Sequence, residues 1–201
     1  MPDSKRLFDL LISVPFAVLL FPLFVIIAVW IKLDSKGPVF VMQDRIGKDG
    51  APFGIFKFRT MVVDAESRGN QITVGSDPRI TRIGHLLRRY KIDELPQLLN
   101  VIKGEMSIVG PRPEVPKYVR LYDAAQRRVL SVRPGITSPA SIKFSNESDL
   151  LGKQPDPENY YIQILIPAKI EEDMGYVDHP GILNDLAIIL RTVRKITKHT
   201  K

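Results

Sequence analysis

The sequence predicts an α+β fold that is mostly helical, and three observations support it. Residues 10–31 carry no charge and are almost all apolar. Two short β-rich runs, residues 39–43 and 53–58, flank the turn sequence Gly47-Lys48-Asp49-Gly50 and predict a small β-hairpin. Most of the remaining chain repeats apolar residues at helical spacing. At 201 residues the chain is expected to form one domain with an appendage.

The apolar run is long enough to cross a bilayer, because about 20 apolar residues suffice for a helix. It spans 22 residues, Leu10–Ile31, and contains Pro15 and Pro22, which bend a helix by removing a backbone hydrogen bond. Lysines and arginines flank both ends, and positive residues prefer the cytoplasmic side. The residues alone leave a spanning helix and a re-entrant helix equally open.

Beyond the hairpin, we expect a polar loop over residues 60–79 and then mainly helices. Helical spacing and terminal signals predict helices over residues 79–90, 93–104, 114–130, 157–174 with a bend at Pro167, and 182–196. Residues 133–137 are expected to form a turn. Several of these helices combine an apolar face with a basic rim, which suits a helix lying on an anionic membrane. Packing of an ordinary core explains the same pattern and is the commoner cause.

The composition indicates an anionic partner. The formal net charge is +7 and the sequence pI is about 9.6, which favours nucleic acid, anionic lipid or a phosphorylated substrate. The chain has no cysteine, which excludes disulfides and thiolate metal sites. Its three histidines are not closely spaced, so a zinc site is not expected. Any metal should be a hard cation on carboxylates and phosphates, magnesium or manganese.

Two adjacent carboxylates, Asp93 and Glu94, stand at the predicted start of a helix, directly after Arg88, Arg89 and Lys91. The helix N-terminus and the basic residues should lower the pKa of Asp93 and keep it ionised. An ionised carboxylate can attack phosphorus or hold magnesium. Adjacent residues on a helix point about 100° apart, so the two are not a pair that shares one proton. The plain alternative is an ordinary helix N-terminus.

Three further basic elements could contact phosphate. Arg112 lies between Pro111 and Pro113, which fix the backbone around a guanidinium that matches phosphate oxygens. Alternation in a strand would put Lys57 and Arg59 on one face. Arg133 belongs to the predicted turn at 133–137. A stiff loop or a solvated sheet face would explain each element equally well.

Taken together, these strings resemble the bacterial sugar transferases, the monotopic phosphoglycosyl transferases. The resemblance rests on IDELPQLLNV at residues 92–101, KGEMS at 103–107 and VGPRP at 109–113. Further matches are KRLFD at 5–9, FKFRTM at 56–61 and RPGIT at 133–137, so nearly the whole chain is covered. These enzymes transfer a sugar phosphate from a nucleotide sugar, usually a UDP-sugar, to undecaprenyl phosphate. One departure is Phe21, where the family often has serine before the helix-breaking proline.

The resemblance implies roles for individual residues. Asp93 would be the nucleophile that attacks the β-phosphate, releases UMP and carries the sugar phosphate, and Glu94 would assist the polyprenol phosphate. Magnesium, with manganese as an alternative, would bind at Asp93 and the diphosphate. The residues implied to contact nucleotide or phosphates are Arg88, Arg112 with Pro111 and Pro113, Lys57, Arg59 and Arg133.

The resemblance also implies a location and partners. Residues 1–36 would form a re-entrant membrane anchor broken at Pro22, and residues 37–201 a catalytic domain on the cytoplasmic face of the bacterial inner membrane. The implied partners are a UDP-sugar, undecaprenyl phosphate and the phospholipid membrane, with no nucleic acid. A homo-oligomer and downstream glycosyltransferases are further candidate partners. Two other functions stay open: a non-catalytic module that binds anionic polymer or lipid, and a phosphohydrolase acting on a lipid diphosphate with water as acceptor.

Overall fold

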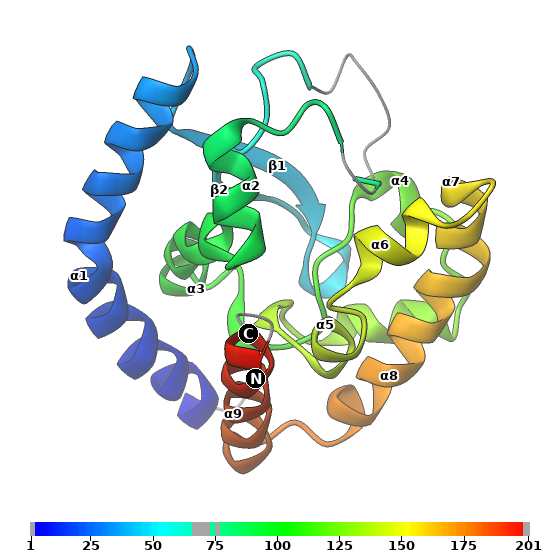
Figure 1. Cartoon of the computed structure of the whole chain (residues 1–201). Helices are drawn as coiled ribbons and strands as arrows, with labels where there is room; N and C mark the ends of the chain where they lie inside the picture. Colours follow the sequence, from blue (N-terminus) through cyan, green and yellow to red (C-terminus); the bar gives the residue numbers. More distant parts are fainter. Residues whose placement is uncertain (1–2, 66–72, 75–76, 199–201) are drawn as a thin grey trace.

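The computed structural model describes residues 3–65, 73–74 and 77–198, and it is mostly helical with two small sheets (Figure 1). The long helix α1, Asp3–Asp34, runs as a bowed rod along one side of the molecule. It is long and apolar enough to cross a membrane. The helix continues through Pro15 and Pro22. The break implied at Pro22 is therefore not seen in this structure, because a proline removes one hydrogen bond while the neighbouring turns persist.

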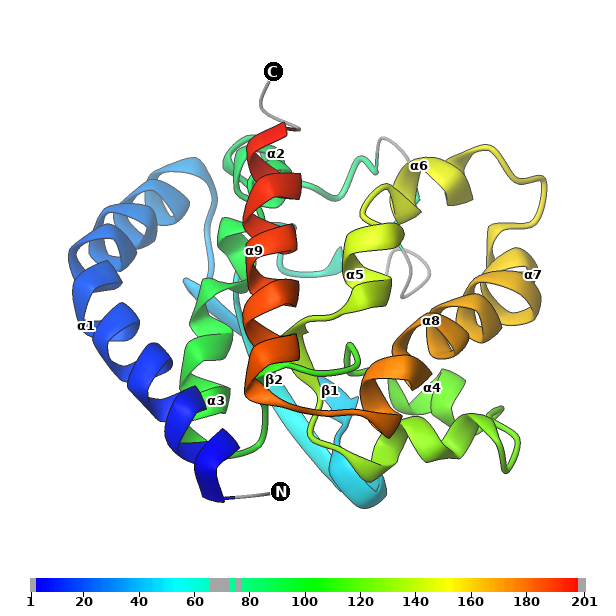
Figure 2. The same cartoon turned by 90° about the horizontal axis from the view of Figure 1, so that it is seen from below.

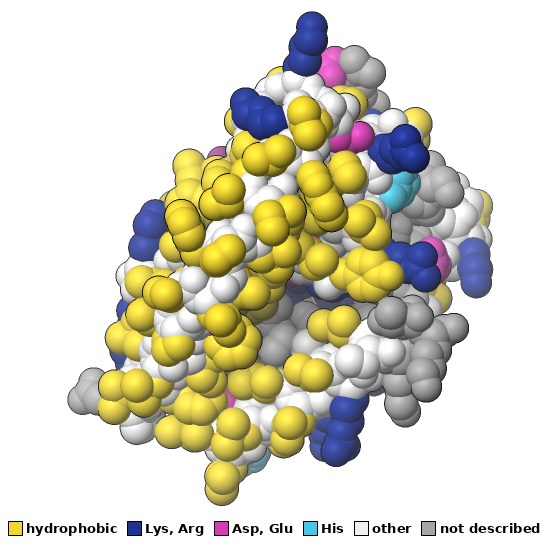
Figure 3. All heavy atoms as spheres, turned by 60° about the vertical axis from the view of Figure 1, so that its left-hand side comes forward, with side chains coloured by type: hydrophobic (Ala, Val, Ile, Leu, Met, Phe, Trp, Pro, Cys, Tyr) yellow, Lys and Arg dark blue, Asp and Glu magenta, His cyan; other side chains and the backbone are white. Residues whose placement is uncertain are grey.

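One stripe of α1 packs against the rest of the protein. The buried side chains in its first half are polar, Lys5, Asp9 and Ser13, and those in its second half are apolar, Ile27 and Ile31. Most other side chains of α1 are exposed and hydrophobic. Figure 3 shows that hydrophobic side chains cover most of this face, with lysines and arginines around its margin. A face of this kind is typical of a membrane-contacting surface.

Both ends of α1 are fastened to the same domain. At the start, the Lys5 Nζ donates to Asp185 Oδ2 at 2.6 Å and to the Val109 carbonyl at 3.3 Å. At the end, Arg59 donates to the carbonyls of Ser35 and Lys36, at 2.8 Å to Ser35. The carbonyls of Ser35 and Lys36, which directly follow α1, thereby gain a donor. The helix therefore lies along the domain over its whole length.

The predicted hairpin is confirmed. Strands β1, Phe40–Ile46, and β2, Pro52–Phe58, are antiparallel and run in register from Phe40 opposite Phe58 to Ile46 opposite Pro52. The turn between them contains η1, Lys48–Gly50. In the predicted loop over 60–79, Met61 bridges to Ile80, and residues 66–72 and 75–76 lie outside the described part.

A second sheet was not expected. Strands β3, Ser107–Val109, and β4, Gly135–Thr137, are parallel, so the prediction of a simple turn at 133–137 is wrong. The two strands approach so closely that a Cβ on Gly135 would lie 2.1 Å from the Gly110 nitrogen. Only glycine permits this contact.

The expected helices at 79–90, 93–104 and 182–196 are present in shorter or extended form, and several short helices surround them (Figure 2). Their bounds are α2 Arg82–Arg89, the 3-10 segment η3 Ile92–Gln97, α3 Leu98–Lys103, α5 Pro139–Lys143, α6 Glu147–Gly152, α7 Pro157–Tyr160, the π-helical turn η5 Tyr161–Leu165, α8 Ile166–Asp178 and α9 Ile182–Lys198. The helix expected at 157–174 thus corresponds to α7, η5 and α8, with Pro167 in the first turn of α8.

The prediction of one continuous helix over residues 114–130 is wrong. It is split into α4, Pro116–Val119, and η4, Gln126–Ser131. The Asp123 nitrogen bonds Gln126 Oε1 at 3.0 Å, and the Gln126 nitrogen bonds Asp123 Oδ1 at 2.8 Å. This reciprocal capping box starts a new helical segment and ends the old one. The apolar residues still gather in one core with Tyr161 and Leu165.

Candidate active site

A sharp turn presents the two carboxylates. Helix α2 ends at Arg89, and Lys91 then takes the left-handed conformation with φ 57°. This conformation is uncommon for residues other than glycine. It turns the chain into η3, whose first turn carries Asp93 and Glu94, exposed to only 7% and 8%. Asn100 then fixes this region to the hairpin, since its side chain donates to the Gly54 carbonyl at 2.7 Å and accepts from the Phe56 nitrogen at 3.0 Å.

Glu94 is held by two cations. Arg112 donates from both terminal nitrogens to its two carboxylate oxygens, Nη1 to Oε2 at 3.0 Å, and the Lys57 Nζ lies 3.1 Å from Oε1. Burial alone would raise the pKa of Glu94, but the charges of Arg112 and Lys57 outweigh it and hold that pKa well below its usual range. The charge of Glu94 in turn raises the pKa of Arg112. Glu94 is therefore an ionised carboxylate whose two oxygens are both paired with cations.

Asp93 lies in a different environment. Burial and then the charge of Glu94 raise its pKa above the ordinary value, against the pull of Lys57, Arg88 and Lys91. The prediction of a lowered pKa for Asp93 is therefore wrong, because it counted the cations and left out burial. Its Oδ1 atom is buried and accepts no hydrogen bond from the described residues. A buried acceptor without a partner is costly, so Asp93 suits a ligand that brings a donor or a cation.

The other predicted site residues divide into two groups. Arg88 adjoins the carboxylates: its charge acts on Asp93, while its Nε donates to Thr60 Oγ1 at 2.8 Å. Arg59 lies elsewhere, because β2 ends at Phe58 and the guanidinium turns to the carboxyl end of α1. Lys57 and Arg59 therefore do not act together. Arg133 lines a separate cavity of about 130 Å³ between the first residues of α1 and α9.

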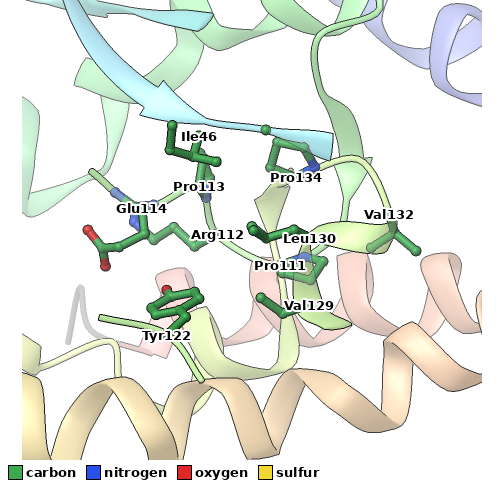
Figure 4. A pocket seen from close by; sticks show the side chains of 11 residues that line it. Ile46, Pro111, Arg112, Pro113, Glu114, Tyr122, Val129, Leu130, Val132 and Pro134 are labelled. Atoms are coloured by element: carbon green, nitrogen blue, oxygen red, sulfur yellow. The ribbon is translucent and has the colours of Figure 1, made fainter. Parts of the chain in front are cut away.

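Pro111 and Pro113 are buried and line a small cavity beside the end of β1, together with Tyr122, Val129 and Pro134 (Figure 4). Its volume is about 20 Å³, which is room for about one water molecule. The two prolines flank Arg112 and shape the backbone that carries it.

One basic residue near the carboxylates was missed from the sequence. Arg45 lies on β1, where burial lowers its pKa and the charges of Glu114 and Glu94 oppose this. The register of the hairpin places it on the face that carries Lys57. Alternation along β1 could have indicated it, once the pairing of the two strands was known.

The arrangement fits a metal only in part. Within residues 3–65, 73–74 and 77–198, no group of three or more histidine, aspartate or glutamate side chains could hold a metal ion. Of the two adjacent carboxylates, Asp93 has an oxygen without a partner among the described residues, whereas Glu94 is taken by Arg112 and Lys57. A cation here would need most of its ligands from a substrate, which is how magnesium binds with phosphates.

The fold and the site define a protein with a long apolar helix and a basic, carboxylate-centred site suited to phosphate chemistry. Comparison with known sequences agrees: the chain belongs to the bacterial sugar transferase family, whose sequence profile matches residues 3–199.

Several curated relatives match over nearly the whole chain. A UDP-N-acetylgalactosamine-undecaprenyl-phosphate N-acetylgalactosaminephosphotransferase of Aeromonas hydrophila is 38% identical over 96% of this chain and 43% of its own length. An undecaprenyl-phosphate glucose phosphotransferase of Komagataeibacter xylinus is 39% identical over 96% of this chain and 35% of its own. The uncharacterised sugar transferase EpsL of Bacillus subtilis is 41% identical over 96% of this chain and 86% of its own. The chain thus spans less than half of the first two relatives.

Proposed function

We propose that this protein transfers a sugar 1-phosphate from a UDP-sugar to undecaprenyl phosphate, giving a lipid-diphosphate-linked sugar and UMP. This would be the first membrane step of a bacterial glycoconjugate pathway. The names of the relatives support the reaction class. The proposal rests on Asp93, a buried carboxylate beside Glu94, Lys57, Arg88 and Arg112, whose Oδ1 accepts no hydrogen bond from the described residues. Phosphoryl transfer needs positioning and charge neutralisation of this kind.

The reaction would proceed in two displacements at one phosphorus atom. The Asp93 carboxylate attacks the β-phosphorus of the donor, and the bond to the bridging oxygen breaks, so that UMP leaves with the bonding electrons. The sugar phosphate is then an acyl phosphate on Asp93. An oxygen of undecaprenyl phosphate attacks the same phosphorus, and the carboxylate is released.

The neighbouring residues would serve this chemistry by charge. The charges of Lys57 and Arg88 act on Asp93, and Arg112 and Lys57 pair directly with Glu94. The low pKa of Glu94 and its two ion pairs favour a role in holding these cations over a role as proton acceptor. Magnesium, or manganese in its place, would be held by Asp93 and the diphosphate oxygens and would supply neutralisation of phosphate charge.

We further propose that residues 1–36 anchor the protein by a re-entrant helix, with residues 37–201 on the cytoplasmic face of the inner membrane. The attachment of both ends of α1 to one domain supports entry and exit on the same side. The chain has no native cysteine, so Ser4→Cys and Lys36→Cys each provide one thiol near an end of α1. In intact cells an impermeant thiol reagent should label neither variant, and after permeabilisation it should label both. Labelling of one variant alone in intact cells would show a spanning helix.

The reaction is tested by measuring UMP release from a panel of UDP-sugars with undecaprenyl phosphate present. Wild type should release UMP from at least one donor, and Asp93→Asn should not. Asp149→Asn is the matched control, because Asp149 is an exposed aspartate. Binding of lipid or anionic polymer without any UMP release would support a non-catalytic module instead. Release of phosphate from a lipid diphosphate in water would support a phosphohydrolase.

A further inference from the structure

Arg45 lies on the same face of the hairpin as Lys57. In an antiparallel pair, opposite residues point to the same side and successive residues alternate. Val41 pairs with Lys57, and Arg45 pairs with Phe53, so both basic side chains leave one face. This face is turned inward. Ile55 lies on β2 between Lys57 and Phe53, the strand partner of Arg45, and is 2% exposed, and Lys57 reaches Glu94. Arg45 and Lys57 therefore form a row of cations on the face of the hairpin that meets Glu94.

The loop that carries Arg112 runs beside the end of β1. The Ile46 nitrogen donates to the Glu114 carbonyl at 2.9 Å. Figure 4 shows Ile46 next to Pro113, with Arg112 and Glu114 on the same loop. Arg45 directly precedes Ile46, so it stands where the strand meets this loop. The geometry brings three cations, Arg45, Lys57 and Arg112, to one region.

Arg45 differs from the other two in its partners. Lys57 and Arg112 both pair with Glu94. Arg45 donates only within its own strand, to the Asp44 carbonyl at 2.9 Å and to Gln43 Oε1 at 3.3 Å. Among the residues that the structure describes, it has no carboxylate within ion-pair distance. Burial lowers its pKa, and the charge of Glu114 only partly opposes this. A partly buried cation among other cations is costly until an anion arrives.

We propose that Arg45 binds the phosphate of the departing nucleotide, which is the α-phosphate of the UDP-sugar. This inference rests on the proposed function, in which Asp93 attacks the β-phosphorus. Lys57 pairs with Glu94, which directly follows the nucleophile Asp93, so Lys57 lies at the β-phosphate. Val41 is the strand partner of Lys57, and Arg45 stands four positions further along the same face of the hairpin, so Arg45 lies further from the nucleophile. That is one phosphate further along the donor.

This position gives Arg45 a role in only one of the two displacements. When the bond to the bridging oxygen breaks, negative charge develops on the phosphate of UMP, and a guanidinium there stabilises it. The second displacement transfers the sugar phosphate from Asp93 to the lipid phosphate, and UMP takes no part in it. Loss of Arg45 should therefore slow formation of the aspartyl adduct and leave its transfer to the lipid unchanged.

The test is UMP binding by calorimetry, with the full-length chain in lipid nanodiscs. Arg45→Gln should weaken UMP binding by about tenfold or more, as expected for loss of a charge-assisted hydrogen bond. Arg45→Lys keeps the positive charge but not the two-pronged guanidinium, and it should lose less UMP affinity than Arg45→Gln. Arg120→Gln is the matched control, because Arg120 is exposed, and it should bind UMP as wild type does. Thermal unfolding checks that each variant is folded, and Arg45→Met replaces Arg45→Gln if the latter does not fold.

A second readout separates this inference from the proposed function. With donor alone, Arg45→Gln should release UMP more slowly than wild type. Once the adduct has accumulated, its transfer to undecaprenyl phosphate should proceed at the wild-type rate. A folded neutral variant that binds UMP as tightly as wild type would overturn the role of Arg45. Wild-type protein that binds no UMP at all would instead overturn the proposed function.

Discussion

Arg112 holds both carboxylate oxygens of Glu94, and the Lys57 ammonium shares one of them. A planar guanidinium matches a carboxylate in this two-pronged way, and an ammonium does not. The pair therefore fixes the orientation of Arg112 as well as its charge. It also joins two segments, since Glu94 belongs to η3 and Arg112 follows β3.

The first prediction concerns this pair. Glu94→Gln leaves Arg112 and Lys57 without a carboxylate partner and should lower the free energy of unfolding by about 2–3 kcal/mol, because charge-assisted hydrogen bonds are lost. The double variant Glu94→Gln/Arg112→Gln should lose less than the sum of the two single variants, measured by chemical denaturation. Strictly additive losses would show that the two side chains do not interact.

The second prediction concerns Asn100, which is fully buried. Asn100→Ala removes the partners of the Gly54 carbonyl and the Phe56 nitrogen, two backbone groups of β2. Unsatisfied buried groups should cost about 2–4 kcal/mol of stability, and UMP release should fall because Lys57 follows Phe56 directly. Asn184→Ala, at an exposed position, is the control and should change little. Equal stability of the two variants would contradict the role of Asn100.

The third prediction concerns the approach of β3 and β4. Gly135→Ala would place a Cβ 2.1 Å from the Gly110 nitrogen, a contact that backbone atoms must move to relieve. Such a shift should cost roughly 3 kcal/mol or more and disturb the loop that carries Arg112. Gly175→Ala in α8 meets no atom within 4 Å and should be neutral or stabilise by up to about 1 kcal/mol. Thermal unfolding of both variants checks this, and a stable Gly135→Ala would contradict the packing.

The fourth prediction concerns pH. Burial raises the pKa of Asp173 from 3.8 to about 6, although its Oδ1 accepts from the Ala140 nitrogen at 2.8 Å. The folded state therefore binds the proton more tightly than the unfolded state, so Asp173 lowers stability as pH rises from about 4 to 6. Relative to wild type, Asp173→Asn should gain up to about 3 kcal/mol between pH 4 and pH 7. Denaturation curves at several pH values measure this, and parallel pH profiles would refute it.

The sequence predicted the elements whose patterns are local. The β-hairpin follows from two β-rich runs about a glycine turn, and α9 from apolar residues at helical spacing. The parallel pair β3 and β4 was not predicted, because three-residue strands that are distant in sequence carry no periodic signal. The prediction of a single helix over residues 114–130 was wrong because the capping box of Asp123 and Gln126 divides the run of apolar residues at helical spacing.

In the candidate site, too, local strings could be identified from the sequence, whereas features that depend on the tertiary fold could not. Asp93, Glu94 and Arg112 could be identified from short strings, and the structure brings Glu94 and Arg112 together. The direction of the pKa of Asp93 was wrong, because burial depends on the whole fold. Arg59 was grouped with Lys57 by alternation, but β2 ends one residue before it. Arg45 was missed because its neighbours come from other segments of the chain.

In the proposed reaction Asp93 forms a covalent bond to phosphorus. This step is tested most directly by intact-mass analysis of the protein after incubation with a donor UDP-sugar and no lipid acceptor. We expect a mass increase equal to one sugar phosphate, mapped by peptide analysis to Asp93 and absent in Asp93→Asn. Adding undecaprenyl phosphate should remove it. Wild-type protein that turns over donor and acceptor, yet never shows this adduct under rapid quenching, would contradict the claim and favour direct transfer.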